Sequence, residues 1–275
     1  MCAPIGYVNT NYLDAAAVLV ADIKQQSFDR MALKRGARVL DLGCGPGTDT
    51  VALARMVGSH GEVHGVDYDV AMVRGADTRA RAEKVDGWVS HHHASATALP
   101  WPSGYFDACR SERVFQHLLD PERAFDEILR VTKAGGQLVV VDSDWATLTI
   151  DTDETELERR LVQFHAAHMM NNPYSGRHLH RMFCRRGLQD IRLNVHPVFI
   201  TDVAVARQIL RLDHVAEEAL AAGVIDAAES LRWQASLSRA AASGGFFASA
   251  NAVLVSGRKP PRLADAPHSR HANEH

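Results

Sequence analysis

The chain has 275 residues, of which 46% are hydrophobic and 23% are charged, as is usual for a soluble globular protein. A formal net charge of -3 gives no global attraction for nucleic acid or for an anionic membrane, and neither is expected as a partner. Four separated cysteines and a start without the pattern of a signal peptide exclude a disulfide scaffold and predict a cytoplasmic protein with free thiols.

The first half of the chain alternates predicted helices and strands. Apolar positions at helical spacing predict a leading helix over residues 11–33. Strands are then predicted at 37–43, 62–67, 87–93, 105–111 and 136–142, and helices at 48–57, 69–84, 112–118 and 121–132. This alternation predicts an α/β fold, in which a Rossmann-like, doubly wound sheet of parallel strands carries helices on both faces.

Beyond residue 150, longer helices alternate with two late strands. The helices are predicted at 152–170, 176–186, 202–222 and 225–242, and the strands in LQDIRLNVHPVFI and FFASANAVLVSGRK. Inserts beside a ligand site commonly act as lids, so the helices of about 152–186 and 202–242 are expected to cap the core at 37–145. We expect one domain over 1–257 and a disordered tail over 258–275, where Pro, His and charge occur without periodicity.

A loop rich in glycine, within VLDLGCGPGTDT at 39–50, ends the first strand and opens a helix. Doubly wound sheets bind ligands at this place. The spacing of Gly43, Gly45 and Gly47 is one residue tighter than the G-x-G-x-x-G fingerprint of dinucleotide sites. Asp41 lies beside the loop, where its charge repels a pyrophosphate and attracts a cation.

The second predicted strand ends in Asp67, at the position where an acid accepts the hydroxyls of an adenosine ribose. An adenosine without phosphates but with a positive centre is S-adenosylmethionine. The loop and the acid together therefore favour this cofactor over a nicotinamide dinucleotide.

Three segments resemble class I S-adenosylmethionine-dependent methyltransferases. They are VLDLGCGPG, VHGVDYDVAMV and FDACRSERVFQHLLDPERAFDEILRVTKAGGQLVVVD. The chain is most similar to the small-molecule type of ubiquinone and menaquinone biosynthesis, and it also resembles bacterial enzymes that methylate indole alkaloids and teleocidin-like indoles. The resemblance implies a seven-stranded, mostly parallel sheet with an antiparallel last strand, and S-adenosylmethionine as cofactor.

The resemblance also implies a set of cofactor-binding residues. Gly43, Cys44, Gly45 and Gly47 would lie under the methionine and ribose, Asp67 would hold the ribose, and Tyr68 and Met72 would pack near the adenine. Where the family has an acid after the third strand, this chain has Ser95 and Ala96, so a hydroxyl or backbone group would replace that carboxylate. The remaining members of the set are Asp41, Ser111 and, from the leading helix, Tyr12, with Gln26 and Ser27 also placed to reach the methionine.

Methyl transfer is an in-line displacement on a carbon that its sulfonium leaving group already activates. The protein therefore supplies alignment, and a base only where the acceptor loses a proton. We expect His117 or Glu112 to be that base. The alternatives stay open: His117 packs as a structural group, or Glu112 and Arg113 form a solvated helix start.

The expected acceptor is a small hydrophobic or aromatic metabolite of the indole, quinone or isoprenoid type, methylated on carbon or nitrogen in natural product biosynthesis. Its predicted contacts are Arg113, Trp145, Met169, Tyr174 and His178, and the cap lining is expected to include Met170, Phe183, Phe199 and Trp233. An O-methyltransferase, a nicotinamide-dependent oxidoreductase and a non-catalytic binding protein are the alternatives. The sequence leaves open whether the chain forms a homo-oligomer.

Two further motifs are expected not to carry chemistry. Adjacent strand residues point to opposite faces, so HHH at 91–93 is not expected to bind a metal. The segment NNPY at 171–174 resembles the Asn-Pro-Pro-Tyr signature of enzymes that methylate amino groups on nucleobases or glutamine. That signature follows the fourth strand, which here ends in CRSER, so a nucleic-acid substrate is disfavoured.

Overall fold

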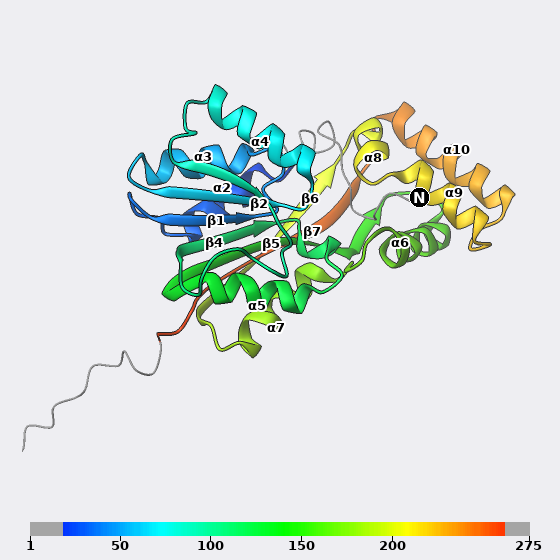
Figure 1. Ribbon diagram of the computed structural model, residues 1–275. Coiled ribbons are helices and arrows are strands. Elements are labelled where there is room, and N and C mark those ends of the chain that lie inside the picture. Colours follow the sequence, from blue (N-terminus) through cyan, green and yellow to red (C-terminus); the bar gives the residue numbers. More distant parts are fainter. Residues whose placement is uncertain (1–18, 262–275) are drawn as a thin grey trace, which may run out of the picture.

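A computed structural model describes residues 19–261 of the chain, and its seven strands form one sheet in the order β3-β2-β1-β4-β5-β7-β6 (Figure 1). β7 is antiparallel to both of its neighbours, and the other neighbouring strands pair in parallel. The expected fold class is therefore confirmed. The strands are β1 (Arg38–Leu42), β2 (Glu62–Asp67), β3 (Val89–His93), β4 (Phe106–Glu112), β5 (Thr132–Ile150), β6 (Gln189–Ile200) and β7 (Ala248–Arg258).

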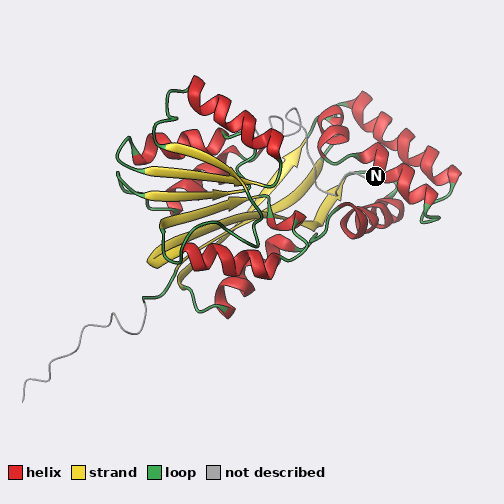
Figure 2. Cartoon of the chain, in the orientation of Figure 1, coloured by secondary structure: helices red, strands yellow, loops and turns green. Residues whose placement is uncertain are grey.

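Helices cover both faces of the sheet (Figures 1 and 2). One face carries α2 (Ala21–Arg30), α3 (Thr48–Val57) and α4 (Val70–Ala82), and the other carries α5 (Pro121–Val131) and α7 (Ser175–Arg185). The remaining helices, α6 (Thr155–Met169), α8 (Val203–Ile209), α9 (Leu212–Ala221) and α10 (Ala227–Ser243), gather beyond one end of the sheet as a cap. Since strand order reverses between β1 and β4, the carboxyl ends of these two strands mark the ligand crevice of such a sheet.

The strand predicted at 136–142 is longer than expected, because β5 runs from Thr132 to Ile150. Its second half pairs with β7 as far as Ile150, after an irregularity between Asp144 and Thr149. Leu148 and Ile150 are buried against the cap helices, so the antiparallel partner and the cap together extend the strand. β5 thus joins the sheet to the cap.

Two helix predictions are corrected by backbone geometry. The segment 112–118 forms only a 3-10 turn, η1 (Phe115–His117), because Glu112 still pairs in β4 and Arg113 has a left-handed φ of 56°. The segment 202–222 is two helices, α8 and α9, because Arg211 between them has a φ of 53°. A left-handed non-glycine residue cannot continue an α-helix.

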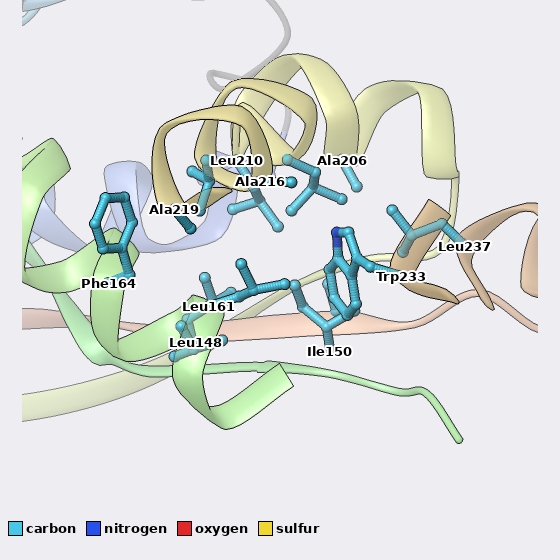
Figure 3. Close-up of a cluster of buried hydrophobic side chains, with 14 of the residues drawn as sticks. Leu148, Ile150, Leu161, Phe164, Ala206, Leu210, Ala216, Ala219, Trp233 and Leu237 are labelled. Carbon is cyan, nitrogen blue, oxygen red and sulfur yellow. The ribbon is translucent and has the colours of Figure 1, made fainter. Parts of the chain in front are cut away.

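The cap has a hydrophobic core of its own, drawn in Figure 3. Trp233 of α10 is only 1% exposed and packs with Leu161 of α6, Leu210 and Ile150. Two residues expected to line the cap lie elsewhere: Phe183 is buried under the sheet against Phe125, and Phe199 is 58% exposed on β6. The cap is therefore a packed helical layer held on β5 and β7.

Acid is expected to destabilise this cap through His165. The side chain is 3% exposed and lies 5.1 Å from the ring of Trp145, and burial, with a smaller effect of Arg211, lowers its pKa to about 4. The pKa of a histidine in the unfolded state is about 6.5. Between pH 6.5 and 4 the unfolded state therefore binds a proton at this histidine and the folded state does not, so the free energy of unfolding falls as the pH drops through this range.

Thermal unfolding of the wild type and of His165→Gln at pH 7.5, 6.0 and 5.0 measures this effect. The midpoint of the wild type should fall more steeply with acid than that of His165→Gln. Exposed His60→Gln is the control and should follow the wild type. Parallel curves for all three proteins would contradict the prediction.

Both ends of the chain extend beyond the described residues. The described part of the predicted leading helix is α2, whereas Tyr12 lies outside the described residues. The predicted tail begins too early, because Arg258 belongs to β7 and Lys259 exchanges backbone hydrogen bonds with Gly135 and Gly136. Within residues 19–261, no helix is long and apolar enough to cross a membrane.

Candidate active site

The glycine loop lies at the carboxyl end of β1, at the reversal of strand order. Gly43, Gly45 and Gly47 all have left-handed backbone, with φ of 74°, 52° and 80°. A Cβ on Gly43 would approach Val114 to 2.1 Å, and a Cβ on Gly47 would approach Ala76 to 2.8 Å. Only glycine meets both the conformation and the packing, so the loop keeps its backbone open above β1.

Asp67, at the end of β2, holds this loop in place. Its Oδ2 accepts a hydrogen bond from the Gly45 N–H at 2.8 Å, and its Oδ1 accepts from the Asp69 N–H at 2.9 Å. Burial raises the pKa of Asp67. The carboxylate therefore sits beside the loop, oriented by two backbone donors and shielded from bulk water.

The residues expected around an adenine differ in how far they are buried. Tyr68 is 77% exposed with its ring 6.0 Å from that of His93, and Met72 is half-buried. The Ser95 hydroxyl is occupied by Thr97, at 2.9 Å between the two oxygens, and Ala96 packs against the core below the sheet. Cys44, whose thiol pKa is raised by burial, points into the protein over Gly65.

Arg110, a fully buried arginine in β4, was not among the site residues predicted from the sequence. Its guanidinium donates to Ser27 Oγ at 2.9 Å, to Asp49 Oδ2 at 2.9 Å and to Asp41 Oδ1 at 3.3 Å, and it also bonds Glu112. Three carboxylates from β1, α3 and β4 thus converge on one cation. We call Arg110 and these three acids the arginine cluster.

Lys24 of α2 adds a second cation to the arginine cluster. Its Nζ lies 2.8 Å from Asp49 and 3.5 Å from Glu112. Burial raises the pKa of Asp41 to about 7 despite the opposing charge of Arg110. Glu112, one of the two expected bases, contacts both Arg110 and Lys24. Arg113 also lies 3.6 Å from its carboxylate. The available signal for this cluster was an Arg that directly follows the apolar residues Ala108 and Cys109 within a predicted strand.

Ser111 of β4 is fully buried beside the end of β1. Its hydroxyl donates at 3.2 Å to the carbonyl of Leu42, the residue before Gly43.

His117, the other expected base, belongs to the η1 turn. Burial, with a smaller effect of Arg113, lowers its pKa to about 4, so the imidazole is neutral at pH 7. The Gln116 amide donates to its Nε2 at 3.1 Å, since the oxygen of that amide accepts from the Trp145 indole. The neutral ring therefore carries its proton on Nδ1, an N–H that is buried without a partner among the described residues.

An apolar cavity lies beside this turn, between the ends of β5, β6 and β7 and helix α8. Glu112, Arg113 and Trp145 are on its wall, and the other side chains lining it are mostly aliphatic, including Val141, Leu148, Val198, Ile200, Ile209 and Leu210. Its volume is about 60 Å³, whereas pockets for drug-sized ligands measure roughly 300–1,000 Å³. A larger acceptor therefore requires its walls to move apart.

The other residues expected to contact the acceptor do not line this cavity. Met169 packs against the cap core. Tyr174 is 42% exposed and stacks with Arg177, 5.2 Å from the ring centre, while the ring of His178 lies 6.1 Å away. The pKa of His178 is lowered by burial and then by the neighbouring arginines.

The HHH segment divides between the two faces of the sheet. His91 contacts Thr50 at 2.9 Å and Asp77 at 2.8 Å, whereas His92 contacts Ser90 on the other face. Among residues 19–261, no three His, Cys, Asp or Glu side chains are grouped so that they could hold a metal ion.

Comparisons with known proteins agree with this geometry. Residues 33–187 match the family model described as a methyltransferase domain. A 37.1 kDa protein of transposon TN4556 from Streptomyces fradiae is 34% identical over 253 residues, which are 91% of this chain and 71% of that protein.

Two further relatives have stated activities. The ubiquinone/menaquinone biosynthesis C-methyltransferase of Yersinia enterocolitica is 36% identical over 119 residues, 43% of this chain, so the match spans about half of that enzyme, 47%. The geranyl diphosphate C-methyltransferase of Streptomyces coelicolor shares the fold, with a TM-score of 0.56 and 18% identity over 94% of this chain and 89% of that one.

The family model covers more than half of the chain, and the glycine loop and the sheet order agree with it. The chain therefore belongs to the methyltransferase domain family and is an S-adenosylmethionine-dependent methyltransferase.

Proposed function

We propose that the enzyme transfers a methyl group to carbon or nitrogen of a small hydrophobic metabolite. The observation that carries this proposal is the apolar cavity whose wall includes Glu112 and Arg113, at the end of the strand next to the glycine loop. A methyl acceptor bound there lies against aliphatic side chains, beside the carboxyl end of β4.

The residues at the loop fit S-adenosylmethionine. The open backbone of Gly43, Gly45 and Gly47 permits a close approach, and the Asp67 carboxylate is suited to accept the two ribose hydroxyls. When bound, the cofactor supplies a methyl group on a positively charged sulfur. Tyr68 and Met72 remain our candidates for the adenine side.

The charges beside the loop favour a cationic cofactor over a pyrophosphate. The three carboxylates of the arginine cluster are matched by Arg110, Lys24 and Arg113, so the remaining negative charge at the loop is that of Asp67. A pyrophosphate would add negative charge to this site, whereas a sulfonium or an ammonium reduces the repulsion. The nicotinamide-dependent alternative is disfavoured for this reason.

Of the two candidate bases, His117 is better suited to accept a proton. Glu112 is engaged by Arg110, Lys24 and Arg113, so three cations compete with an acceptor for its carboxylate oxygens. The His117 imidazole is neutral at pH 7, and its basic nitrogen is Nε2, which accepts from one neutral donor, the Gln116 amide. A pKa of about 4 still makes it a weak base, which suits an acceptor that loses its proton after the methyl group has been added.

The cavity favours an acceptor with an aliphatic part, because Trp145 is the one aromatic side chain among its described lining residues. Relatives include C-methyltransferases of a quinone pathway and of geranyl diphosphate. We therefore place quinone and isoprenoid acceptors ahead of indoles, for which no observation provides support. A role in natural product biosynthesis is part of the proposal, whereas O-methylation is the alternative to it, and identification of the methylated atom distinguishes the two.

Calorimetry and a transfer assay test the proposal together. S-adenosylhomocysteine should bind to the wild type, and radioactive methyl should pass from S-adenosylmethionine to at least one compound among menaquinone precursors, geraniol, geranyl diphosphate and substituted indoles. Ala250→Phe fills the cavity from β7 and should block transfer while cofactor affinity is kept. Cofactor binding without transfer to any compound would favour the non-catalytic alternative, and binding of a nicotinamide dinucleotide instead would overturn the proposal.

A further inference from the structure

The segment NNPY at 171–174 lies against the η1 turn, although more than 50 residues separate the two in the sequence. The Asn172 amide donates to the Phe115 carbonyl at 3.0 Å and also to the Leu118 carbonyl. The Asn172 backbone N–H donates to the Gln116 carbonyl at 2.9 Å. The Asn171 amide donates to the His117 carbonyl at 2.7 Å. Four successive carbonyls of the turn are therefore held by two asparagines.

The same segment also holds the cavity wall. The Trp145 backbone N–H donates to the Pro173 carbonyl at 2.9 Å, and the Trp145 indole N–H donates to the Gln116 side-chain oxygen at 2.7 Å. The Gln116 backbone N–H in turn donates to Asp142 of β5 at 3.0 Å. The turn, Trp145 and the NNPY segment thus form one connected hydrogen-bond network.

The two asparagines of this motif face the main chain of the turn. Both amide nitrogens donate to carbonyls of residues 115–118, and neither asparagine is among the described lining residues of the apolar cavity. Tyr174 is directed towards Arg177 and solvent. The motif serves a different purpose in this chain.

We propose that Asn171 and Asn172 are positioning residues that fix the η1 turn and, through Gln116, the indole of Trp145 on the acceptor side of the site. They act on the acceptor cavity and not on the glycine loop, because their described side-chain hydrogen bonds all go to the turn. This inference rests on the proposed function, in which the cavity receives the acceptor.

Asn172→Asp tests the inference, because it keeps the shape of the side chain and removes both amide donors. The control is Asn194→Ala, which removes an amide from β6, where Asn194 Oδ1 accepts from Arg30 at 2.7 Å. The protein has four tryptophans and so four indole N–H signals in a nitrogen-15 NMR spectrum, and Trp145→Phe identifies the one from Trp145. The other measurements are S-adenosylhomocysteine affinity and the rate of methyl transfer to the acceptor found above.

In Asn172→Asp we expect the Trp145 indole signal to move, methyl transfer to slow by roughly 10- to 100-fold, and cofactor affinity to stay within about twofold of the wild type. Asn194→Ala should leave the Trp145 signal in place. If Asn172→Asp does not fold, Asn171→Ala, which loses a single bond to the turn, replaces it.

An unmoved Trp145 signal would overturn the inference, and so would a loss of cofactor affinity as large as the loss of transfer. Failure of the wild type to bind S-adenosylhomocysteine would instead overturn the proposed function, and the Trp145 signal would still report on the network.

Discussion

Arg110→Met is expected to lower the free energy of unfolding at pH 7 by about 3–5 kcal/mol, the usual cost of removing one partner from a buried ion pair. Arg110 is fully buried, and its guanidinium is the shared partner of Asp41, Asp49 and Glu112. Methionine fills a similar volume without charge. The loss therefore comes from three acids left close together in a poorly solvated place, with Lys24 and Arg113 as their remaining cations.

The free energy of unfolding that Arg110→Met loses should become smaller as pH falls. Without Arg110, burial and mutual repulsion raise the pKa values of these carboxyl groups in the folded state above their unfolded values. A group with a raised folded pKa binds its proton more tightly in the folded state, so stability recovers as pH falls through that folded pKa. The difference between variant and wild type should thus be largest near pH 8 and smaller at pH 5.

Urea unfolding followed by circular dichroism at pH 8, 7 and 5 measures both effects. Arg258→Met is the matched control, because Arg258 pairs with Asp190 on the surface, where both side chains are largely exposed. Such a pair contributes about 0–1 kcal/mol. If Arg110→Met cost no more than Arg258→Met, the arginine cluster would not need its central cation.

The core of the fold could be predicted because its local signals and its tertiary environment agree. The apolar run of β5 and the glycines after β1 each have one sensible place in a parallel sheet. The predicted length of β5 was wrong, because tertiary contacts decide where this strand ends. β5 continues to Ile150 only because β7 and the cap cover it, and no local pattern reveals those partners.

The site was predictable at the loop and less so beneath it. Asp67 lies beside Gly45 as its place at the end of β2 indicates, because parallel neighbouring strands bring their carboxyl ends together. Arg110 was missed because a buried arginine is interpretable only with its partners, and these come from α2, β1 and α3. The role of Asn172 was equally hidden, since its acceptors are main-chain carbonyls.

The structure places charge and apolar surface on opposite sides of Glu112. The arginine cluster lies on one side, and the aliphatic cavity, whose wall includes Glu112 itself, lies on the other. A cationic cofactor and a hydrophobic acceptor require these two environments next to each other. Glu112 is therefore better understood as the boundary between them than as a free base.

Asp67→Ala is expected to weaken the binding of S-adenosylhomocysteine by about 1–3 kcal/mol, roughly 5- to 150-fold, because a charged acceptor of two hydroxyl hydrogen bonds is lost. The glycine loop also loses a hydrogen bond, since the Gly45 N–H donates to this carboxylate at 2.8 Å. Asp67→Asn keeps one side-chain oxygen and should fall between Ala and the wild type.

Calorimetric titration of the three proteins with S-adenosylhomocysteine measures the effect, and Asp69→Ala is the control. Asp69 is an acid two residues away that caps α4 by accepting from the Ala71 N–H at 2.8 Å, so its loss should cost about 0.5–2 kcal/mol of stability and leave cofactor affinity unchanged. Equal affinities in Asp67→Ala and the wild type would mean that the ribose does not lie against β2. In that case the glycine loop would need another partner to hold the cofactor.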